Sequence, residues 1–267
     1  MHGADGYAMK ADMASHNERI LDQFTRQAVP FSTAASIRDV AALRLLVDAA
    51  GTGPDDTVLD VACGPGLVVC AFARRARHAT GIDLTPAMLE RGHALAAEQG
   101  LDNVTFDLGD VRPLPYPDAA FSIVISRFAF HHFQDPAAVL AEMRRVCRPG
   151  GRVAVADLTA SPDAAKAAAF HHMEMMRDPS HARALTLEEL RGLFRDAGFA
   201  APAEAYWQMD IEVEDLLSRS FPAAGTTDTI RRLFADAVAD DALGLNTRLV
   251  KERVRFNYSN VVLTAAR

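Results

Sequence analysis

The stretch VLDVACGPG at positions 58–66 joins an aspartate to a glycine-containing turn. Its first four residues are mostly apolar and β-branched, a pattern typical of a buried parallel strand. Ala62, Gly64 and Gly66 remove side-chain bulk where the chain must turn and a ligand can contact its backbone. The apolar residues 67–76 indicate a helix whose N-terminus points back at that ligand. A strand, a tight turn and a helix predict a nucleotide-type binding site.

The spacing of this turn disfavours a dinucleotide. Gly64-Pro65-Gly66 and Val69 give the pattern G-x-G-x-x-V, which lacks the third small residue that lets a helix pack beside a pyrophosphate. Pro65 also removes a backbone N–H from the turn. A cofactor without phosphates would need neither feature.

Further acidic residues follow other apolar segments. Asp83 comes directly after a short strand at 79–82, and in an open parallel sheet an acid at this place meets the ribose hydroxyls. Gly109 and Asp110 follow a third apolar run. Strands predicted at 104–108, 121–126 and 152–156 alternate with helices. This alternation predicts a doubly wound α/β fold with a mostly parallel sheet.

Four segments together resemble the successive motifs of class I S-adenosylmethionine-dependent methyltransferases, within the UbiE-like small-molecule methyltransferase group. They are VLDVACGPG, GIDLTPAMLERG, LGDVRPLPYPDAAFSIVISRFAFHHFQDP and RRVCRPGGRVAVAD. The resemblance implies a Rossmann-like sheet of seven strands, the last antiparallel and formed by 254–265, with helical lid insertions. One departure is Ala62, where the family usually has glycine.

The resemblance also implies a cofactor, S-adenosyl-L-methionine, with S-adenosyl-L-homocysteine as its product. Asp83 would bind the ribose hydroxyls and Asp110 the adenine amino group, while Asp60 would lie at the methionine part. The residues expected to contact the cofactor are Phe24, Gln27, Asp60, Ala62, Gly64, Gly66, Asp83, Leu84, Met88, Gly109, Asp110, Val111, Arg127 and Phe128.

The 267 residues suit one methyltransferase domain. We expect an N-terminal arm and helix over the cofactor at 1–36, of which residues 1–15 carry no pattern, and a cofactor-binding core at 37–160. Insertions at 161–185 and 211–250 would form a lid over the carboxyl ends of the strands, where ligands bind in such sheets.

Composition limits the partners. Lysine and arginine total 28 against 35 acidic residues, a formal charge of −7, and no basic run suits nucleic acid, so a small-molecule substrate is expected. Cys63, Cys70 and Cys147 have no metal-binding spacing, so no metal is expected. Neither a signal peptide nor a membrane-length apolar run is visible, which predicts a cytoplasmic protein without membrane insertion. The sequence does not indicate an oligomeric state.

Methyl transfer from a sulfonium depends mainly on alignment and exclusion of water. An acceptor that must lose a proton also needs a general base, for which histidine is suited. The candidates are His181, His131 and His171, and Asp178 would raise the basicity of His181.

The expected function is transfer of a methyl group to an oxygen, nitrogen or carbon of a small, partly apolar or aromatic molecule. Two alternatives stay open at this point. A protein that binds the cofactor without transferring its methyl, as a rearrangement catalyst or a sensor, would carry the same motifs. A NAD-dependent oxidoreductase is disfavoured by the missing third glycine and by Gly109-Asp110.

Overall fold

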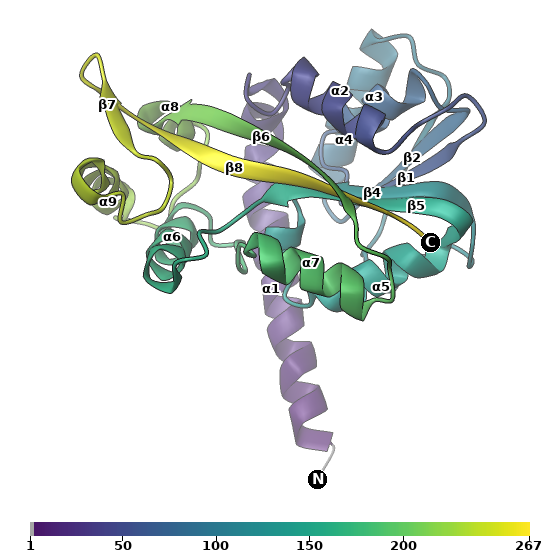
Figure 1. The fold of residues 1–267 in the computed structure, drawn as a ribbon, viewed down its shortest axis with the longest axis horizontal. Helices are drawn as coiled ribbons and strands as arrows, with labels where there is room; N and C mark the ends of the chain where they lie inside the picture. Colours follow the sequence, from purple (N-terminus) through teal and green to yellow (C-terminus); the bar gives the residue numbers. More distant parts are fainter. Residues whose placement is uncertain (1–2) are drawn as a thin grey trace.

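The structure is a computed structural model that describes the backbone of residues 3–267 and the side chains from Ser15 onward. Its strands are β1 (Thr57–Val61), β2 (His78–Asp83), β3 (Val104–Leu108), β4 (Phe121–Arg127), β5 (Cys147–Leu158), β6 (Ala203–Glu212), β7 (Arg248–Val250) and β8 (Arg253–Ala266). They form one sheet in the order β3-β2-β1-β4-β5-β8-β6, with β7 paired to β8 (Figure 1).

The sheet confirms the predicted Rossmann-like topology. Strands β1 to β5 are parallel, and β8 lies antiparallel between β5 and β6. The antiparallel last strand expected at 254–265 is therefore present. The sheet has one strand more than the seven expected, because the short β7 forms a hairpin with the start of β8.

The helices are α1 (Gly3–Thr33), α2 (Val40–Ala49), α3 (Leu67–Ala73), α4 (Pro86–Glu98), α5 (Pro136–Val146), α6 (Ala164–Arg177), α7 (Leu187–Asp196), α8 (Val213–Ser218) and α9 (Thr227–Asp240), with a 3₁₀ turn η1 (Phe130–His132). Helices α2 to α4 lie on one side of the sheet and α5 and α7 on the other (Figure 1).

Alternating residues of the central strands pack against the helices on the two faces of the sheet. Leu59 and Val61 pack with α5 and α7, whereas Val58 packs with α2 and α3. This alternation follows from the period of two in a strand. Strand β4 is buried along its whole length, as the apolar segment at 121–126 predicts for a central parallel strand.

The two insertions share a third apolar core. Phe170 and Met173 on α6 pack with Leu216 on α8, with Phe234 on α9 and with residues of β6 and β8. The capping box that begins α7 lies between the insertions. Figure 1 shows α6, α8 and α9 together beside the end of β6 and the start of β8, away from α2 and α3.

Helix α1 crosses the carboxyl ends of the parallel strands. His16 Nε2 lies 2.7 Å from the carbonyl oxygen of His132, in the turn after β4, and Gln23 donates to the carbonyl of Phe221. The segment at 1–15, in which we saw no pattern, is helical from Gly3 onward, and positions 1 and 2 lie outside the described residues. Within the described chain, no helix has the length and apolar character needed to span a membrane.

Candidate active site

A cavity of about 1170 Å³, including its open mouth, lies between α1 and the carboxyl ends of β1 to β4. We call it the strand-end cavity. Asp60 comes from β1, Asp83 from the end of β2, Asp110 from the segment after β3 and Arg127 from the end of β4. These side chains meet because parallel strands place their carboxyl ends at one edge of the sheet.

Most residues expected to contact a cofactor line this cavity. They are Phe24, Asp60, Ala62, Gly64, Asp83, Leu84, Met88, Asp110, Val111, Arg127 and Phe128. Gly66 and Gly109 do not line the cavity. Gln27 is not among the lining residues either, because its side chain lines a neighbouring cavity and donates a 3.1 Å hydrogen bond to Asp178.

Asp83 is held rigidly at the floor of the strand-end cavity. Its Oδ2 accepts a 2.8 Å hydrogen bond from the N–H of Gly64, and its Oδ1 accepts a 2.9 Å bond from the N–H of Thr85. Burial raises the pKa of Asp83, and these backbone bonds oppose that rise. Each carboxylate oxygen keeps a lone pair for a ligand hydroxyl.

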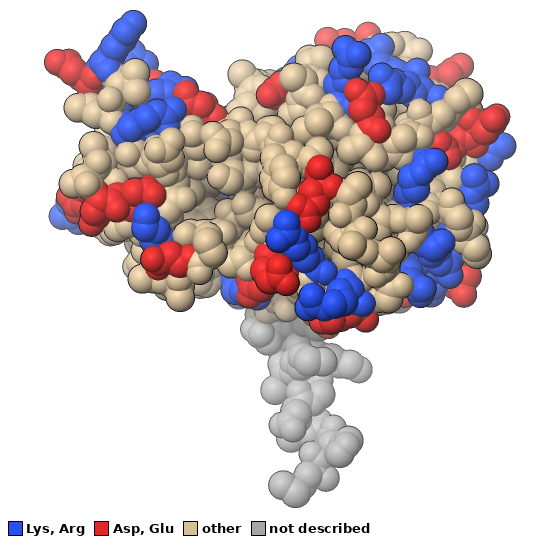
Figure 2. Space-filling view, in the orientation of Figure 1, with Lys and Arg blue, Asp and Glu red and all other residues tan. Residues whose placement is uncertain are grey.

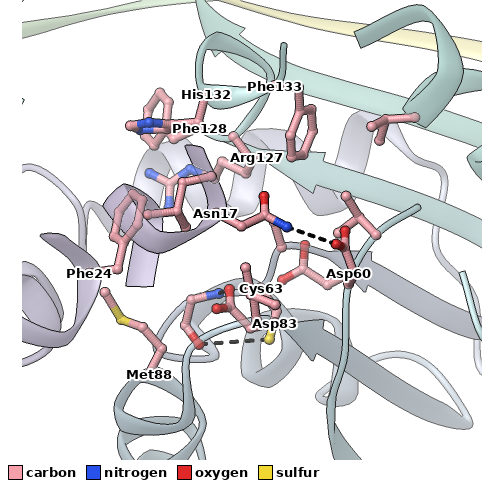
Figure 3. A pocket seen from close by; sticks show the side chains of 18 of the residues that line it. Asn17, Phe24, Asp60, Cys63, Asp83, Met88, Arg127, Phe128, His132 and Phe133 are labelled. Atoms are coloured by element: carbon pink, nitrogen blue, oxygen red, sulfur yellow. Dashed lines mark hydrogen bonds between the residues drawn. The ribbon is translucent and has the colours of Figure 1, made fainter. Parts of the chain in front are cut away.

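Asp60 and Arg127 carry polar atoms that lack protein partners. Both carboxylate oxygens of Asp60 are buried with no hydrogen bond, as are Nε and Nη2 of Arg127. Burial, and after it the charge of Asp83, raises the pKa of Asp60 well above its ordinary range. Figure 3 shows Asp60 and Asp83 pointing into the same space. Because buried polar groups are normally paired, these orphan atoms indicate a polar ligand.

The turn after β1, at residues 62–66, is tight enough to require small residues. Ala62 has a φ of 58°, in the left-handed region that favours glycine, which accounts for the family preference at this position. Helix α3 packs closely on the sheet without a third glycine in the motif, because its Val69 lies over Gly81 of β2. A Cβ on Gly81 would lie 2.7 Å from Val69 Cγ2 and 2.6 Å from Cys63 Sγ.

Helix α1 forms the roof of the strand-end cavity. Asn17 and Phe24 project from it towards Asp60, Asp83 and Met88 (Figure 3). The Phe24 ring packs edge-on against His132, with ring centroids 5.0 Å apart. Helix α1 lies within the segment 1–36, for which we expect an arm and a helix over the cofactor.

A second cavity, of about 670 Å³ including its open mouth, adjoins the first. We call it the insertion cavity, because Arg177, Leu216 and Arg219 reach it from the insertions. It shares with the strand-end cavity the residues Phe24, Phe31, Ile37, Phe128 and His132.

Phe128 therefore stands between the two cavities. Its φ is 56°, a strained conformation for a bulky residue, and its N–H donates a 2.8 Å hydrogen bond to the carbonyl of Ala156. The guanidinium of Arg127 lies 4.5 Å from the centre of the Phe128 ring.

His131 is the candidate base that lines the insertion cavity. Its Nδ1 lies 2.7 Å from Oδ1 of Asp157, and its backbone N–H donates to Oδ2 of the same carboxylate. Burial works against protonation, but Asp157 outweighs it and raises the pKa of His131 above 6.5. When Nδ1–H donates to this carboxylate, Nε2 is left as an acceptor for a proton. This is the arrangement of an oriented general base.

His181 and His171 line neither cavity. The premise that Asp178 raises the basicity of His181 is wrong. Asp178 accepts bonds from Ser180 and Gln27, while both ring nitrogens of His181 are buried without partners. Burial, and then His131, lowers the pKa of His181, and burial also lowers that of His171.

The comparisons with known proteins identify the family. The family profile described as "Methyltransferase domain" matches residues 59–155. The uncharacterized methyltransferase YcgJ of Bacillus subtilis is 32% identical over 177 residues, which span 66% of this chain and 70% of YcgJ. The chain belongs to the class I S-adenosylmethionine-dependent methyltransferases. Its methyl donor is S-adenosylmethionine, as the resemblance implied.

Solved structures agree with this methyltransferase along most of its length. The YcgJ structure has a TM-score of 0.78 at 27% identity, and that of BH2331 from Bacillus halodurans has 0.76 at 28%; each match covers 85% of this chain and 98% of the other. A geranyl diphosphate C-methyltransferase from Streptomyces coelicolor, solved with S-adenosyl-L-homocysteine among its ligands, has a TM-score of 0.60 at 18% identity and matches 85% of this chain and 78% of that chain. This last likeness shows the fold alone.

The strand-end cavity of this methyltransferase suits such a cofactor. S-adenosylmethionine carries ribose hydroxyls, an ammonium and a carboxylate, and Asp83, Asp60 and Arg127 offer unused acceptors and donors of matching kind. Among the residues that the structure describes, no group of three or more His, Cys, Asp or Glu side chains could hold a metal ion.

Sequence reasoning missed several residues of the two cavities. Asp157 ends a predicted strand just as Asp83 does, so its place in the sheet could have marked it as a partner for His131. Asn17 and Arg219 carried no comparable signal, because they lie on segments without a motif.

Proposed function

We propose that this methyltransferase transfers the methyl group to an oxygen, nitrogen or carbon of a small, partly apolar organic molecule bound in the insertion cavity. The observation that carries this proposal is the junction of the two cavities at Phe128. Side chains such as Met209 and Ile211 give this cavity the apolar walls that are usual for a small-molecule site.

Surface charge supports a small acceptor. On the face of the described residues shown in Figure 2, basic and acidic side chains are interspersed rather than gathered into a basic stripe. A protein that binds nucleic acid needs such a stripe to neutralise phosphates. The formal charge of −7 points the same way.

The cofactor contacts are part of the proposal. Asp83 accepts hydrogen bonds from the ribose hydroxyls while its backbone bonds fix its orientation. Asp60 faces the ammonium of the methionine moiety, where a cation offsets the cost of a buried carboxylate, and Arg127 faces the carboxylate. Asp110 binds the adenine amino group at the rim, next to Asn17.

The residues around the junction then have distinct tasks. When bound, S-adenosylmethionine supplies a sulfonium methyl that needs no further activation. Phe128 and Phe24 exclude water and align the acceptor, and well-oriented reactants gain about 7–11 kcal/mol from such positioning. His131 Nε2 takes the proton from an acidic acceptor atom, and Asp157 holds the ring in the required tautomer.

Mass spectrometry tests the proposal. The purified protein is incubated with S-adenosylmethionine and a panel of phenols, amines and enolisable acids, and products are searched for a gain of 14 mass units together with S-adenosylhomocysteine. We expect both, and we expect Phe128→Ala to lower the yield without abolishing cofactor binding. Conversion of an acceptor with neither signal would favour a non-methylating catalyst and overturn the proposal.

A further inference from the structure

Two arginines line the insertion cavity, and they differ in how their charges are neutralised. Arg177 donates from Nε to Glu174 at 2.9 Å and lies 3.9 Å from Asp178. Both acids are themselves fully engaged, because Tyr258 donates a 2.7 Å bond to Glu174 and Ser180 and Gln27 donate to Asp178. Arg177 is therefore a structural cation within a closed network.

Arg219 has no such counter-ion. It follows the last residue of α8, and its Nη1 donates a 2.8 Å hydrogen bond to the hydroxyl of Ser36. Among the described residues, no carboxylate lies within 4.0 Å of its guanidinium, and no other side-chain hydrogen bond forms there. Burial lowers the pKa of Arg219. A partly buried guanidinium without a carboxylate in contact is costly at a cavity wall unless an anion joins it.

We propose that Arg219 binds a carboxylate of the methyl acceptor, so that the substrates of this enzyme are small organic acids with an apolar body. This inference rests on the proposed function of the insertion cavity. A guanidinium presents parallel N–H donors that match the two oxygens of a carboxylate. One unpaired positive charge suits a monoanion, and the nearby Glu174 and Asp178 disfavour a dianion such as a phosphate ester.

The apolar body has a defined place. Leu216 stands three residues before Arg219 on α8, and Met209 and Ile211 of β6 line the same cavity. Phe128 and His131 line the insertion cavity as well, and Phe128 also lines the strand-end cavity. An acid anchored at Arg219 would then meet the cofactor past Phe128, the side chain that the two cavities share.

Binding to the protein saturated with S-adenosylhomocysteine tests this without turnover. The probes are 4-hydroxyphenylacetate and indole-3-acetate, each paired with its neutral amide, and phenyl phosphate, all measured by titration calorimetry and ligand-observed NMR. We expect each acid to bind roughly 10- to 150-fold more tightly than its amide, the range of a hydrogen bond to a charged group.

Variants locate the effect. Arg219→Gln should remove the preference for the acid and leave amide binding unchanged, while Arg219→Lys should keep part of the preference. Arg253→Gln is the matched control, because Arg253 of β8 is an exposed arginine paired with Glu212 of β6. Affinity for S-adenosylhomocysteine and the melting temperature, Tm, show that each variant is folded.

Several results would overturn the inference. Equal binding of acid and amide, an Arg219→Gln variant that keeps the preference, or no binding of either acid at millimolar concentration would each do so. Tighter binding of phenyl phosphate than of the acids would assign a phosphate ester instead. If S-adenosylhomocysteine binds but acids are not preferred, only this inference fails; if S-adenosylhomocysteine itself does not bind, the proposed function fails as well.

Discussion

Asn17 of helix α1 donates a 3.0 Å hydrogen bond from Nδ2 to Oδ2 of Asp110, in the segment that follows β3. This bond joins the roof of the strand-end cavity to its rim, over a sequence separation of 93 residues. The other carboxylate oxygen of Asp110 accepts a bond from the N–H of Arg112. We therefore expect this bond to help α1 hold the cofactor in the cavity and to slow its release.

Replacement of Asn17 by Ala should speed cofactor release. An exposed hydrogen bond to a carboxylate contributes about 1 kcal/mol, so S-adenosylhomocysteine should dissociate roughly fivefold faster in stopped-flow measurements. Glu18→Ala is the control, because Glu18 is the exposed next residue of the same helix. An unchanged dissociation rate in Asn17→Ala would show that α1 does not gate the cavity.

Replacement of Asp83 by Asn should weaken cofactor binding. The amide keeps the size of the side chain but loses the charge and one acceptor, and a charged hydrogen bond contributes about 1.5–3 kcal/mol. Calorimetry should show a dissociation constant for S-adenosylhomocysteine raised by roughly 10- to 150-fold. The exposed Asp102, changed to Asn, should leave it unaltered. Equal affinities for the two variants would remove Asp83 from the ribose site.

The His131–Asp157 pair predicts a pH dependence. The base acts in its neutral form, and Asp157 raises the pKa of His131 above 6.5, so kcat/KM should increase with pH through a midpoint above 6.5 and then level off. Asp157→Asn removes the partner that opposes burial, so this midpoint should move to lower pH. A midpoint unchanged by the substitution would mean that another group titrates.

Replacement of His131 by Gln should lower kcat for an acidic acceptor by about 10²- to 10⁴-fold, the usual contribution of a general base. Cofactor affinity should stay the same, because His131 lines only the insertion cavity. His172→Gln, at an exposed position of α6, is the control. A normal rate in His131→Gln would leave alignment alone as the source of catalysis.

Replacement of Gly81 on β2 by Ala should destabilise the packing of the turn after β1 and of helix α3 against this strand. The added Cβ would meet Cys63 Sγ at 2.6 Å and Val69 Cγ2 at 2.7 Å, and overpacking of this kind costs about 1–3 kcal/mol. The melting temperature should fall by several degrees in calorimetry. Gly53→Ala, with its nearest atom at 3.8 Å, should be close to neutral. A Gly81→Ala protein as stable as the wild type would contradict the packing described.

The sequence predicted what depends on local pattern. Asp60, Asp83 and Asp110 each stand at or next to the end of an apolar run, and the rule that parallel strands share one edge brings them together. The position of the last strand followed from the family resemblance, and β8 occupies it.

What escaped prediction depends on tertiary contacts. His181 and Asp178 are close in sequence, but the turn directs Asp178 at Ser180 instead. Phe24 lines both cavities, whereas Gln27, about one helical turn further along α1, lines only the insertion cavity of the two. Arg219 belongs to an insertion whose packing no motif encodes.

A crystal structure of the complex with S-adenosylhomocysteine tests the central claim most directly. The account predicts ribose hydroxyls within hydrogen-bonding distance of Asp83 and a sulfur atom facing the insertion cavity past Phe128. A ligand bound outside the strand-end cavity, or one whose sulfur faces away from the insertion cavity, would contradict it.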